Sequence, residues 1–482
     1  MRHLPLAAAL TALLLQSIPA VIAADETQKN DPATCSNVTI KSAGDARHIG
    51  LACTTIVGDL HLSPDLNETV TLNGIENVTG SVLFKGRCQF EGYSDVPTQS
   101  SADQCGDIPE PFSFRSTSLR AIQGNFTINT WLGLSNIELP LLQRVMGEFN
   151  LRSLLNLTQL DVSSLARVGD FNLEAPRLQD LKHDGLEGFT KATANLTVRS
   201  ADLDSLDSLL RPRTKAVAKW PDQPDDWPLF RTPQSVALYT EDMSRLANMT
   251  IAWPKLVTLT INPDFVNDTV LRDGVAPRLM LGSGEGNSTT MSIRDLVVQG
   301  VETLELHSSL TGGLVDGHKF QLAWTNTQGN FKVPFSNLTI LDVFGNDKME
   351  SIELPSSEGI VRNLDDLQIS GKGLLVDKLV WPKDNMSTVK LTGKIQQAAF
   401  VSFLQDRNPD DVNSTTRPLV TDFAVTGHAG SNFSCEPFDR LKQQNVITGE
   451  YSCLIQSAAS RSVSVTFSTA MVLATIIFLL MS

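Results

Sequence analysis

The chain has 482 residues, of which 41% are hydrophobic and 19% are charged, so it is long enough to bury one extended core or two ordinary ones. Its formal net charge is −14, and no stretch combines clustered Lys and Arg with aromatic residues. The composition therefore argues against nucleic acid as a partner, while the acidity favours a well-solvated surface.

The first residues have the pattern of a secretory signal peptide. Arg2 and His3 precede an apolar run over residues 4–22, and the small residues Ala23 and Ala24 follow it. A short apolar run that ends in small residues is typical of a cleaved signal, whereas an N-terminal membrane anchor would need a longer run. We expect residues 1–23 to be the signal peptide, with cleavage after Ala23 or Ala24.

A short motif recurs along the first half of the chain. It consists of a glycine, a small polar or acidic residue and an apolar-x-apolar pair, and it begins at Gly58, Gly80, Gly124, Gly147 and Gly169. Successive copies are 22 or 23 residues apart, except that about two periods separate the second from the third. A constant period in the twenties is typical of a solenoid whose turns each contribute one short strand and a return loop.

Each copy of the motif also alternates with the period of a β-strand. In the copy that begins at Gly124, Phe126 and Ile128 fall on one face of the strand, and Asn125 and Thr127 on the other. We expect the two apolar residues to point inward and the two polar residues to face water. Because one turn cannot enclose its own apolar face, neighbouring turns must stack to form a continuous core.

Two repeat regions are expected, at residues 35–210 and 236–456. Between them, residues 211–235 contain five prolines and two Trp-Pro steps, which resist both helix and central strand, so we interpret them as a linker or a large insertion. The second region has looser spacing, although Ile-Glu-Leu-Pro at 352–355 repeats the sequence at 137–140. Helical periodicity is rare, so we expect mainly strands and loops with short helices at the termini.

Six cysteines lie in three close pairs near the two ends of the expected fold. A secreted chain with an even number of cysteines is expected to form disulfide bonds, and nearest-neighbour pairing is the simplest of about fifteen connectivities. The bonds expected in this way are Cys35–Cys53, Cys88–Cys105 and Cys435–Cys453. CxxC-type spacing is absent, which argues against a zinc site, and bridges at the ends would close the terminal turns of a solenoid.

The chain also contains thirteen Asn-x-Ser/Thr sequons, which predict a densely glycosylated surface if the chain is secreted. The acceptors are Asn37, Asn67, Asn77, Asn125, Asn156, Asn195, Asn248, Asn267, Asn287, Asn337, Asn385, Asn413 and Asn432. Asn125 is on the outward phase of its strand, where a glycan would not disturb the core.

The last residues match a GPI-attachment signal. Small residues at 457–459, a spacer through Thr469 and an apolar run over 470–481 follow one another in the order that such a signal requires. We expect Ser457 to be the attachment residue, with Ala458 and Ser460 as the next choices, and residues 458–482 to be the removed propeptide. The alternative is a transmembrane helix over 463–481, but it lacks the basic flank that would hold it in place.

Sequence motifs of catalysis are absent: there is no HExxH, GxSxG, P-loop or CxxC, and the seven histidines form no metal-ligand spacing. We therefore expect no cofactor, metal or catalytic residue. A glycosidase would need two facing carboxyl groups. The places to look for such a pair are Glu138 with Glu353, from the repeated motif, and Asp365 with Asp366, although solvated positions are the plainer interpretation.

Tryptophans are the other residues that a carbohydrate could use, because flat apolar sugar faces pack on aromatic rings. The relevant residues are Trp220, Trp227, Trp253, Trp324 and Trp381. In a solenoid, a tryptophan more often fills the core or anchors a loop, and we expect that role for most of them.

Taken in order, these features resemble a known family. The signal peptide, the early cysteine pair, the glycine-containing turns, the ending Cys435…Gly-Glu-Tyr-Ser-Cys453 and the GPI signal are together similar to the fungal GPI-anchored cell-wall-organisation proteins of the sporulation-specific and extracellular-mutant type. The resemblance covers nearly the whole mature chain. It implies a right-handed β-helix similar to the receptor L domain and its leucine-rich repeats, in two halves with disulfide-capped ends.

The resemblance also implies a function, which is the maintenance of the fungal cell wall without an established catalytic site. Expected partners are wall polysaccharide or wall proteins, and the expected location is the outer leaflet of the plasma membrane, through the GPI anchor, or the wall. No long Ser/Thr-rich stalk precedes Ser457, which favours a position close to the membrane. Two alternatives remain open: a GPI-anchored glucan hydrolase or transglycosylase, and a receptor-like module that binds a peptide or protein.

Overall fold

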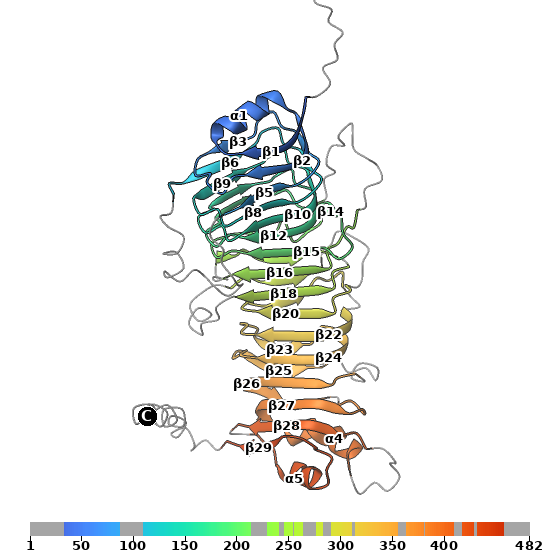
Figure 1. The fold of residues 1–482 in the computed structure, drawn as a ribbon. Helices are drawn as coiled ribbons and strands as arrows, with labels where there is room; N and C mark the ends of the chain where they lie inside the picture. The colour runs from blue at the N-terminus through green and yellow to red at the C-terminus, as the bar shows by residue number, and fades with distance from the viewer. Residues whose placement is uncertain are drawn as a thin grey trace, which may run out of the picture.

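The computed structural model describes residues 33–86, 109–213, 229–240, 245–253, 255–263, 276–282, 291–310, 314–354, 363–379, 381–408, 417–428 and 431–456. These residues form a β-solenoid, a single column of stacked strands capped by a short helix at each end (Figure 1). The mainly β solenoid with short terminal helices that the sequence predicts is thus confirmed. The predicted signal peptide, the Cys88–Cys105 pair and the GPI signal lie outside the described residues.

The main sheet runs the length of the column, and its successive strands all pair in parallel. In spatial order its strands are β1 (Thr34–Ile40), β2 (Thr55–Leu62), β5 (Val82–Lys85), β8 (Phe126–Asn129), β10 (Arg144–Arg152), β12 (Arg167–Glu174), β15 (Asn195–Arg199), β16 (Ser235–Thr240), β18 (Thr258–Pro263), β20 (Asp295–Gln299), β22 (Leu314–Ala323), β24 (Phe335–Phe344), β26 (Asp366–Val376), β27 (Met386–Ile395), β28 (Val420–Gly427) and β29 (Tyr451–Ile455).

Shorter strands form the other walls of the column. A second parallel sheet contains β3 (Val70–Thr71), β6 (Phe112–Arg115), β9 (Leu134–Glu138), β11 (Gln159–Asp161) and β13 (Asp180–Lys182), and we call it the side sheet. A third contains β17 (Met249–Ile251), β19 (Leu279–Leu281) and β21 (Leu304–Leu306). The remaining short strands are β4 (Asn77–Val78), β7 (Ala121–Ile122), β14 (Gly188–Phe189), β23 (Gly329–Lys332) and β25 (Met349–Glu353).

The recurring glycine forms a hydrogen-bonded ladder from turn to turn. The Gly124 amide donates to the Gly80 carbonyl at 2.8 Å, and the Gly147 amide donates to the Gly124 carbonyl at 2.9 Å. The polar residue after each glycine extends the ladder with its side chain: the Asn125 amide donates to Ser81 Oγ at 3.0 Å, and Asn125 Oδ1 accepts from the Glu148 amide at 2.8 Å. The motif therefore fixes the register between neighbouring turns.

The core fills the column with apolar side chains from every turn. Phe126, Phe149 and Phe171 occupy equivalent positions on three successive strands and are fully buried, with ring centroids 5.2 Å apart in each neighbouring pair. Phe126 and Ile128 are both 0% exposed, whereas Asn125 is exposed, as the alternation predicts. Stacking identical side chains in this way keeps the core continuous although no turn could enclose it alone.

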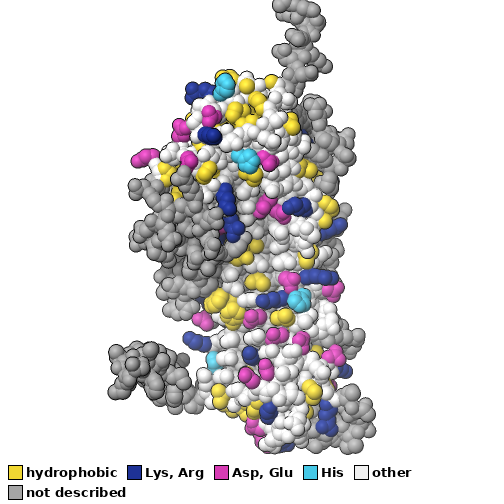
Figure 2. Space-filling view, in the orientation of Figure 1, with side chains coloured by type: hydrophobic (Ala, Val, Ile, Leu, Met, Phe, Trp, Pro, Cys, Tyr) yellow, Lys and Arg dark blue, Asp and Glu magenta, His cyan; other side chains and the backbone are white. Residues whose placement is uncertain are grey.

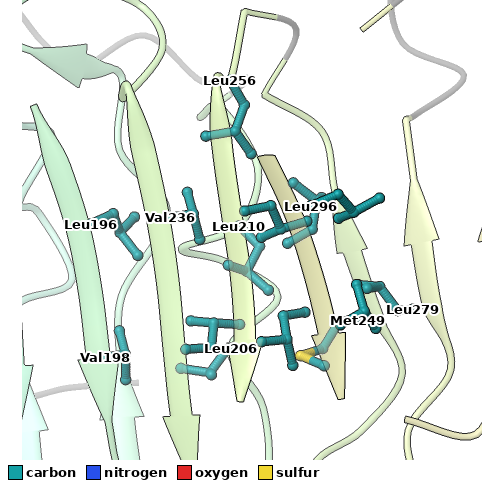
Figure 3. Packing of buried hydrophobic residues seen from close by; sticks show 14 of the residues in the cluster. Leu196, Val198, Leu206, Leu210, Val236, Met249, Leu256, Leu279 and Leu296 are labelled. Carbon is teal, nitrogen blue, oxygen red and sulfur yellow. The ribbon is translucent and has the colours of Figure 1, made fainter. Parts of the chain in front are cut away.

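The main sheet and the core continue across the proline-rich segment. β15 pairs directly with β16, so that Leu196 lies opposite Val236, although 35 residues separate the ends of the two strands at Arg199 and Ser235. Figure 3 shows Leu196, Val198 and Val236 packed with Leu206 and Leu210 beneath these strands. Part of the predicted linker lies outside the described residues, and its boundaries stay a prediction.

Each end of the column is closed by a helix that a disulfide bond ties to the terminal strand. At one end Cys35 of β1 is bonded to Cys53, which caps α1 (Ala43–Ala52). At the other, Cys453 of β29 is bonded to Cys435, which caps α5 (Glu436–Gln443). The predicted disulfide-capped ends are confirmed. The other helices are η2 (Gln397–Phe400) and α4 (Val401–Asp406), and no helix of the described ranges is long and apolar enough to cross a membrane.

Candidate functional site

The broadest continuous surface of the column is the outward side of the main sheet, which faces the viewer in Figures 1 and 2. Parallel pairing aligns its outward residues in rows that cross the strands. Two middle rows, from β8 to β27, form what we call the central face. The first row contains Thr127, Asn150, Asn172, Thr197, Ala237, Thr260, Val297, Gln321, Asp342, Gln368 and Lys390. The second row contains Asn129, Arg152, Glu174, Arg199, Tyr239, Asn262, Gln299, Ala323, Phe344, Ser370 and Thr392. Most of these residues are polar, and Figure 2 shows charged side chains only scattered over this side.

None of the thirteen sequons falls on the central face. Of the ten acceptor asparagines in the described residues, none is buried. Asn125 and Asn195 lie at the upstream border of the main sheet, one position before the buried row, and Asn37 and Asn337 also lie on main-sheet strands, β1 and β24. The central face itself contains four asparagines, Asn129, Asn150, Asn172 and Asn262, but none is followed two residues later by Ser or Thr. Glycans at the described sequons would therefore attach outside the two rows, the nearest at Asn125 and Asn195, two residues before Thr127 and Thr197.

A groove of about 400 Å³ opens on the central face where β12, β15 and β16 meet, and we call it the Tyr239 groove. Its walls are Asn172, Glu174, Thr197, Arg199 and Tyr239. The Arg199 guanidinium lies 5.9 Å from the centroid of the Tyr239 ring, a cation–π distance that holds the ring at the groove. The groove thus combines one aromatic ring with amide, hydroxyl, carboxylate and guanidinium groups.

A second groove, of about 520 Å³, lies on the side sheet. Across it, Thr71, Arg115, Glu138, Asp161 and Lys182 stand opposite one another on successive strands. Glu138 forms an ion pair with Arg115 at 3.2 Å, while the Asp161 carboxylate accepts hydrogen bonds from the Ser163 amide and hydroxyl. The structure thus places Glu138 beside Asp161, and both carboxylates already have partners.

The structure places the residues of the two carboxylate pairs named from the sequence in different surroundings. Glu353 ends β25, far along the column from Glu138 on β9, so the structure does not bring these two together (Figure 1). Asp365 accepts hydrogen bonds from the Ser387 amide and hydroxyl, which is the same turn-to-turn ladder seen after the glycines. Asp366 lies instead on the outward side of β26, close to Asp342 of β24.

Burial shifts the acidity of these two outward carboxyl groups. Partial desolvation raises the pKa of Asp342, with the Lys319 charge opposing and the Asp366 charge adding to the shift. Desolvation also raises the pKa of Asp366, which a hydrogen bond from Gln368 partly offsets. Because the lysine charge lies beside both acids, this group is an ion network on the surface of the sheet rather than an isolated acid pair.

The tryptophans in the described residues belong mainly to the core, as the sequence interpretation favours. Trp253 is 0% exposed and packs on Phe189, and Trp381 is 4% exposed and donates its indole N–H to the Ala399 carbonyl at 2.6 Å. Trp324 is half-buried and meets Phe344 edge to face, while Trp220 and Trp227 lie outside the described residues. Sequence reasoning missed Tyr239. The alternation of residues 235–240 indicates a strand with Tyr239 on its outward face, which could have marked it as a binding residue.

No group of three or more His, Cys, Asp or Glu side chains in the described ranges is arranged to hold a metal ion. Burial, and to a lesser extent the nearby Arg213 charge, lower the pKa of His183 to about 3. Its Nδ1 accepts from the Gly185 amide at 2.8 Å, and its Nε2 has no hydrogen-bond partner among the described residues. This histidine is therefore held neutral in the folded protein.

A buried neutral histidine makes stability depend on pH. The unfolded chain binds a proton at His183 below pH 6.5, but the folded protein does not until about pH 3. Stability should therefore fall as the pH drops below 6.5, by about 2–3 kcal/mol between pH 7 and 4.5. Urea unfolding at both pH values should show this loss, and His183→Asn, whose side-chain oxygen can accept the same hydrogen bond, should reduce it. An identical pH slope in the variant would contradict the assignment.

Together, these features define a mainly β solenoid with disulfide-capped ends and a grooved, mostly polar face. In the comparison with curated proteins, the chain is 23% identical over 445 residues to the protein ecm33 of Aspergillus fumigatus, covering 92% of this chain and 86% of that protein. It is also 28% identical over 163 residues to the cell wall protein ecm33 of Schizosaccharomyces pombe, covering 33% of this chain and 34% of that protein. The family resemblance that the sequence motifs indicate is thereby confirmed, and the chain is related to the fungal ecm33 proteins. No family model matches the chain, and the comparison with solved structures gave no significant match.

Proposed function

We propose that the protein is a non-enzymatic glycoprotein of the fungal cell surface, anchored through GPI at Ser457, whose central face binds wall polysaccharide and so helps to organise the wall. The similarity to a Schizosaccharomyces pombe protein whose name is cell wall protein ecm33 supports the location. A motif-free sequence and relatives whose names are not enzyme names support a role without catalysis.

The single observation that carries the binding role is the open central face. It is a mostly polar surface along the column, and none of the ten sequon asparagines in the described residues belongs to it. A rigid surface of this kind suits a repetitive ligand, because successive strands present their outward residues at a constant spacing. Polysaccharide fits this description better than a folded wall protein, whose surface does not repeat.

The test places a glycan on the central face. Arg152→Thr completes a sequon at Asn150, within the face, whereas Lys332→Thr completes one at Asn330 on β23, outside it. The full chain and both variants would be produced in a fungal host, glycan addition confirmed by mass, and retention on insoluble β-glucan and chitin measured. We expect the glycan at Asn150 to abolish retention and the one at Asn330 to leave it unchanged.

Two results would contradict this proposal. If the unmodified protein is retained on neither polymer but captures wall proteins, the partner is protein. If the glycan at Asn150 leaves retention intact, binding uses another surface. The Lys332→Thr protein controls for the bulk of an added glycan, so a loss in both variants would not count in favour of the central face.

One observation favours a carbohydrate-active enzyme as a second candidate. Glu138 and Asp161 stand side by side in a groove of about 520 Å³, and paired carboxyl groups are what glycosidases use. Mass spectrometry of β-glucan and chitin oligosaccharides incubated with the protein would show new chain lengths in that case, and Glu138→Gln would remove them. Under the non-enzymatic proposal, the chain lengths stay unchanged.

A further inference from the structure

The Tyr239 groove has the mixture of groups that a neutral sugar requires. A pyranose presents apolar C–H faces and hydroxyl groups that both donate and accept hydrogen bonds. The Tyr239 ring supplies an aromatic surface for the first, and Asn172 and Thr197 supply donors and acceptors for the second. Asn172 and Thr197 lie opposite each other on β12 and β15, and Tyr239 lies on the next strand, β16, in the neighbouring row opposite Arg199.

Charges around the groove are balanced, which disfavours an anionic ligand. Arg152 forms an ion pair with Glu174 at 3.5 Å, and Arg199 lies over the Tyr239 ring. The groove therefore has no uncompensated cluster of cations to attract a polyanion, and the net charge of −14 on the whole chain would repel one. A neutral polymer needs no cluster of cations and is not repelled by the net negative charge.

The spacing of the strands sets how such a polymer would lie. Strands in a sheet are about 4.8 Å apart, which is close to the length of one pyranose unit in an extended chain. Asn172 Nδ2 donates to Asn150 Oδ1 at 3.2 Å, so that amide groups follow one another from strand to strand beside the groove. A chain laid along the column would meet one strand per sugar, with Asn150, Asn172 and Thr197 as the polar residues on three successive strands.

From these contacts we propose that the Tyr239 groove is a subsite for a neutral, extended β-linked polysaccharide that lies across the strands, with one sugar stacked on the Tyr239 ring. This inference rests on the proposed function and adds the ligand class, its direction and the residue that anchors it. Arg199 positions the ring, and Asn172 and Thr197 bind the hydroxyl groups of the neighbouring sugars.

The test uses the full chain with Tyr239→Ala, Tyr239→Phe and, as a control in the same row but outside the groove, Thr392→Ala. Binding of hexamers of β-1,3-glucan and chitin would be measured by calorimetry, and retention on the insoluble polymers in parallel. We expect Tyr239→Ala to weaken binding at least tenfold, about 1.4 kcal/mol. Tyr239→Phe keeps the ring and should lose threefold or less, and Thr392→Ala should bind as the unmodified protein does.

The outcomes separate this inference from the proposed function. If the unmodified protein binds and Tyr239→Ala binds equally well, the subsite is wrong while polysaccharide binding stands. If the unmodified protein binds neither the hexamers nor the polymers, the proposed function fails. Tighter binding of an anionic oligosaccharide than of both neutral hexamers would overturn the ligand class. Because Tyr239→Phe preserves the ring, a loss as large as that of Tyr239→Ala would indicate that stacking is not what anchors the sugar.

Discussion

Replacement of Phe149 by alanine should lower the free energy of unfolding by about 3–5 kcal/mol. Phe149 is 0% exposed and lies between Phe126 and Phe171, with ring centroids 5.2 Å away on both sides. Removing the Phe149 ring would leave a cavity between the Phe126 and Phe171 rings. The hydrogen-bonded strands hold the backbone at a fixed spacing, so these two side chains cannot move in to fill the cavity. Urea unfolding monitored by circular dichroism measures the change.

Two variants show whether the loss comes from packing. Phe149→Leu keeps most of the buried volume and should cost clearly less than alanine. Asn150→Ala changes the next residue, which faces outward on the same strand, and should stay within about 1 kcal/mol. A cost below about 1.5 kcal/mol for Phe149→Ala would mean that the column can adjust its turn spacing, contrary to the ladder described above.

Gly124→Ala should cost about 3 kcal/mol, at the upper end of what one added methyl group usually costs in a packed interior. A Cβ at this position would lie 2.4 Å from Ser81 Oγ and 2.7 Å from the backbone carbonyl carbon and oxygen of Gly80. Two of these atoms belong to the backbone of the preceding turn and cannot rotate away. The turns would have to separate, which would strain the hydrogen bond from the Gly124 amide to the Gly80 carbonyl.

Gly373→Ala is the matched control, since a Cβ there would meet only the Asp347 carbonyl oxygen, at 3.7 Å. Thermal unfolding of both variants should show a clear decrease for Gly124→Ala and little change for Gly373→Ala. Equal melting temperatures would indicate that the recurring glycine is required for some reason other than close approach of neighbouring turns.

The solenoid could be predicted because its determinants are local and repeated. The alternation around Phe126 and the period of the glycine motif are both visible in the sequence, and each follows from one physical requirement of stacked strands. The pairing of β15 with β16 could not be predicted, because residues 200–234 are far longer than one return loop and their length does not specify where the next strand docks.

The candidate site was less accessible to sequence reasoning, because it depends on which turns become neighbours. Glu138 and Glu353 share a motif, but the motif marks the end of a strand in each half rather than a shared site. Glu138 instead meets Asp161, 23 residues later, through the register of β9 and β11. Tyr239 is outward in an alternating stretch, but only the register of β15 and β16 places it opposite Arg199, and an outward tyrosine ring can stack on a sugar as a tryptophan can.

The main sheet also sets how far the protein reaches. From β1 to β29 its strands follow one another through fifteen spacings, and at about 4.8 Å each the stack is about 70 Å long. Its first and last strands lie at opposite poles (Figure 1). If the column is tethered at the C-terminal pole, as proposed, and stands upright on the membrane, its far cap would lie about 70 Å from the tethered end and its two grooves at different heights above the lipid.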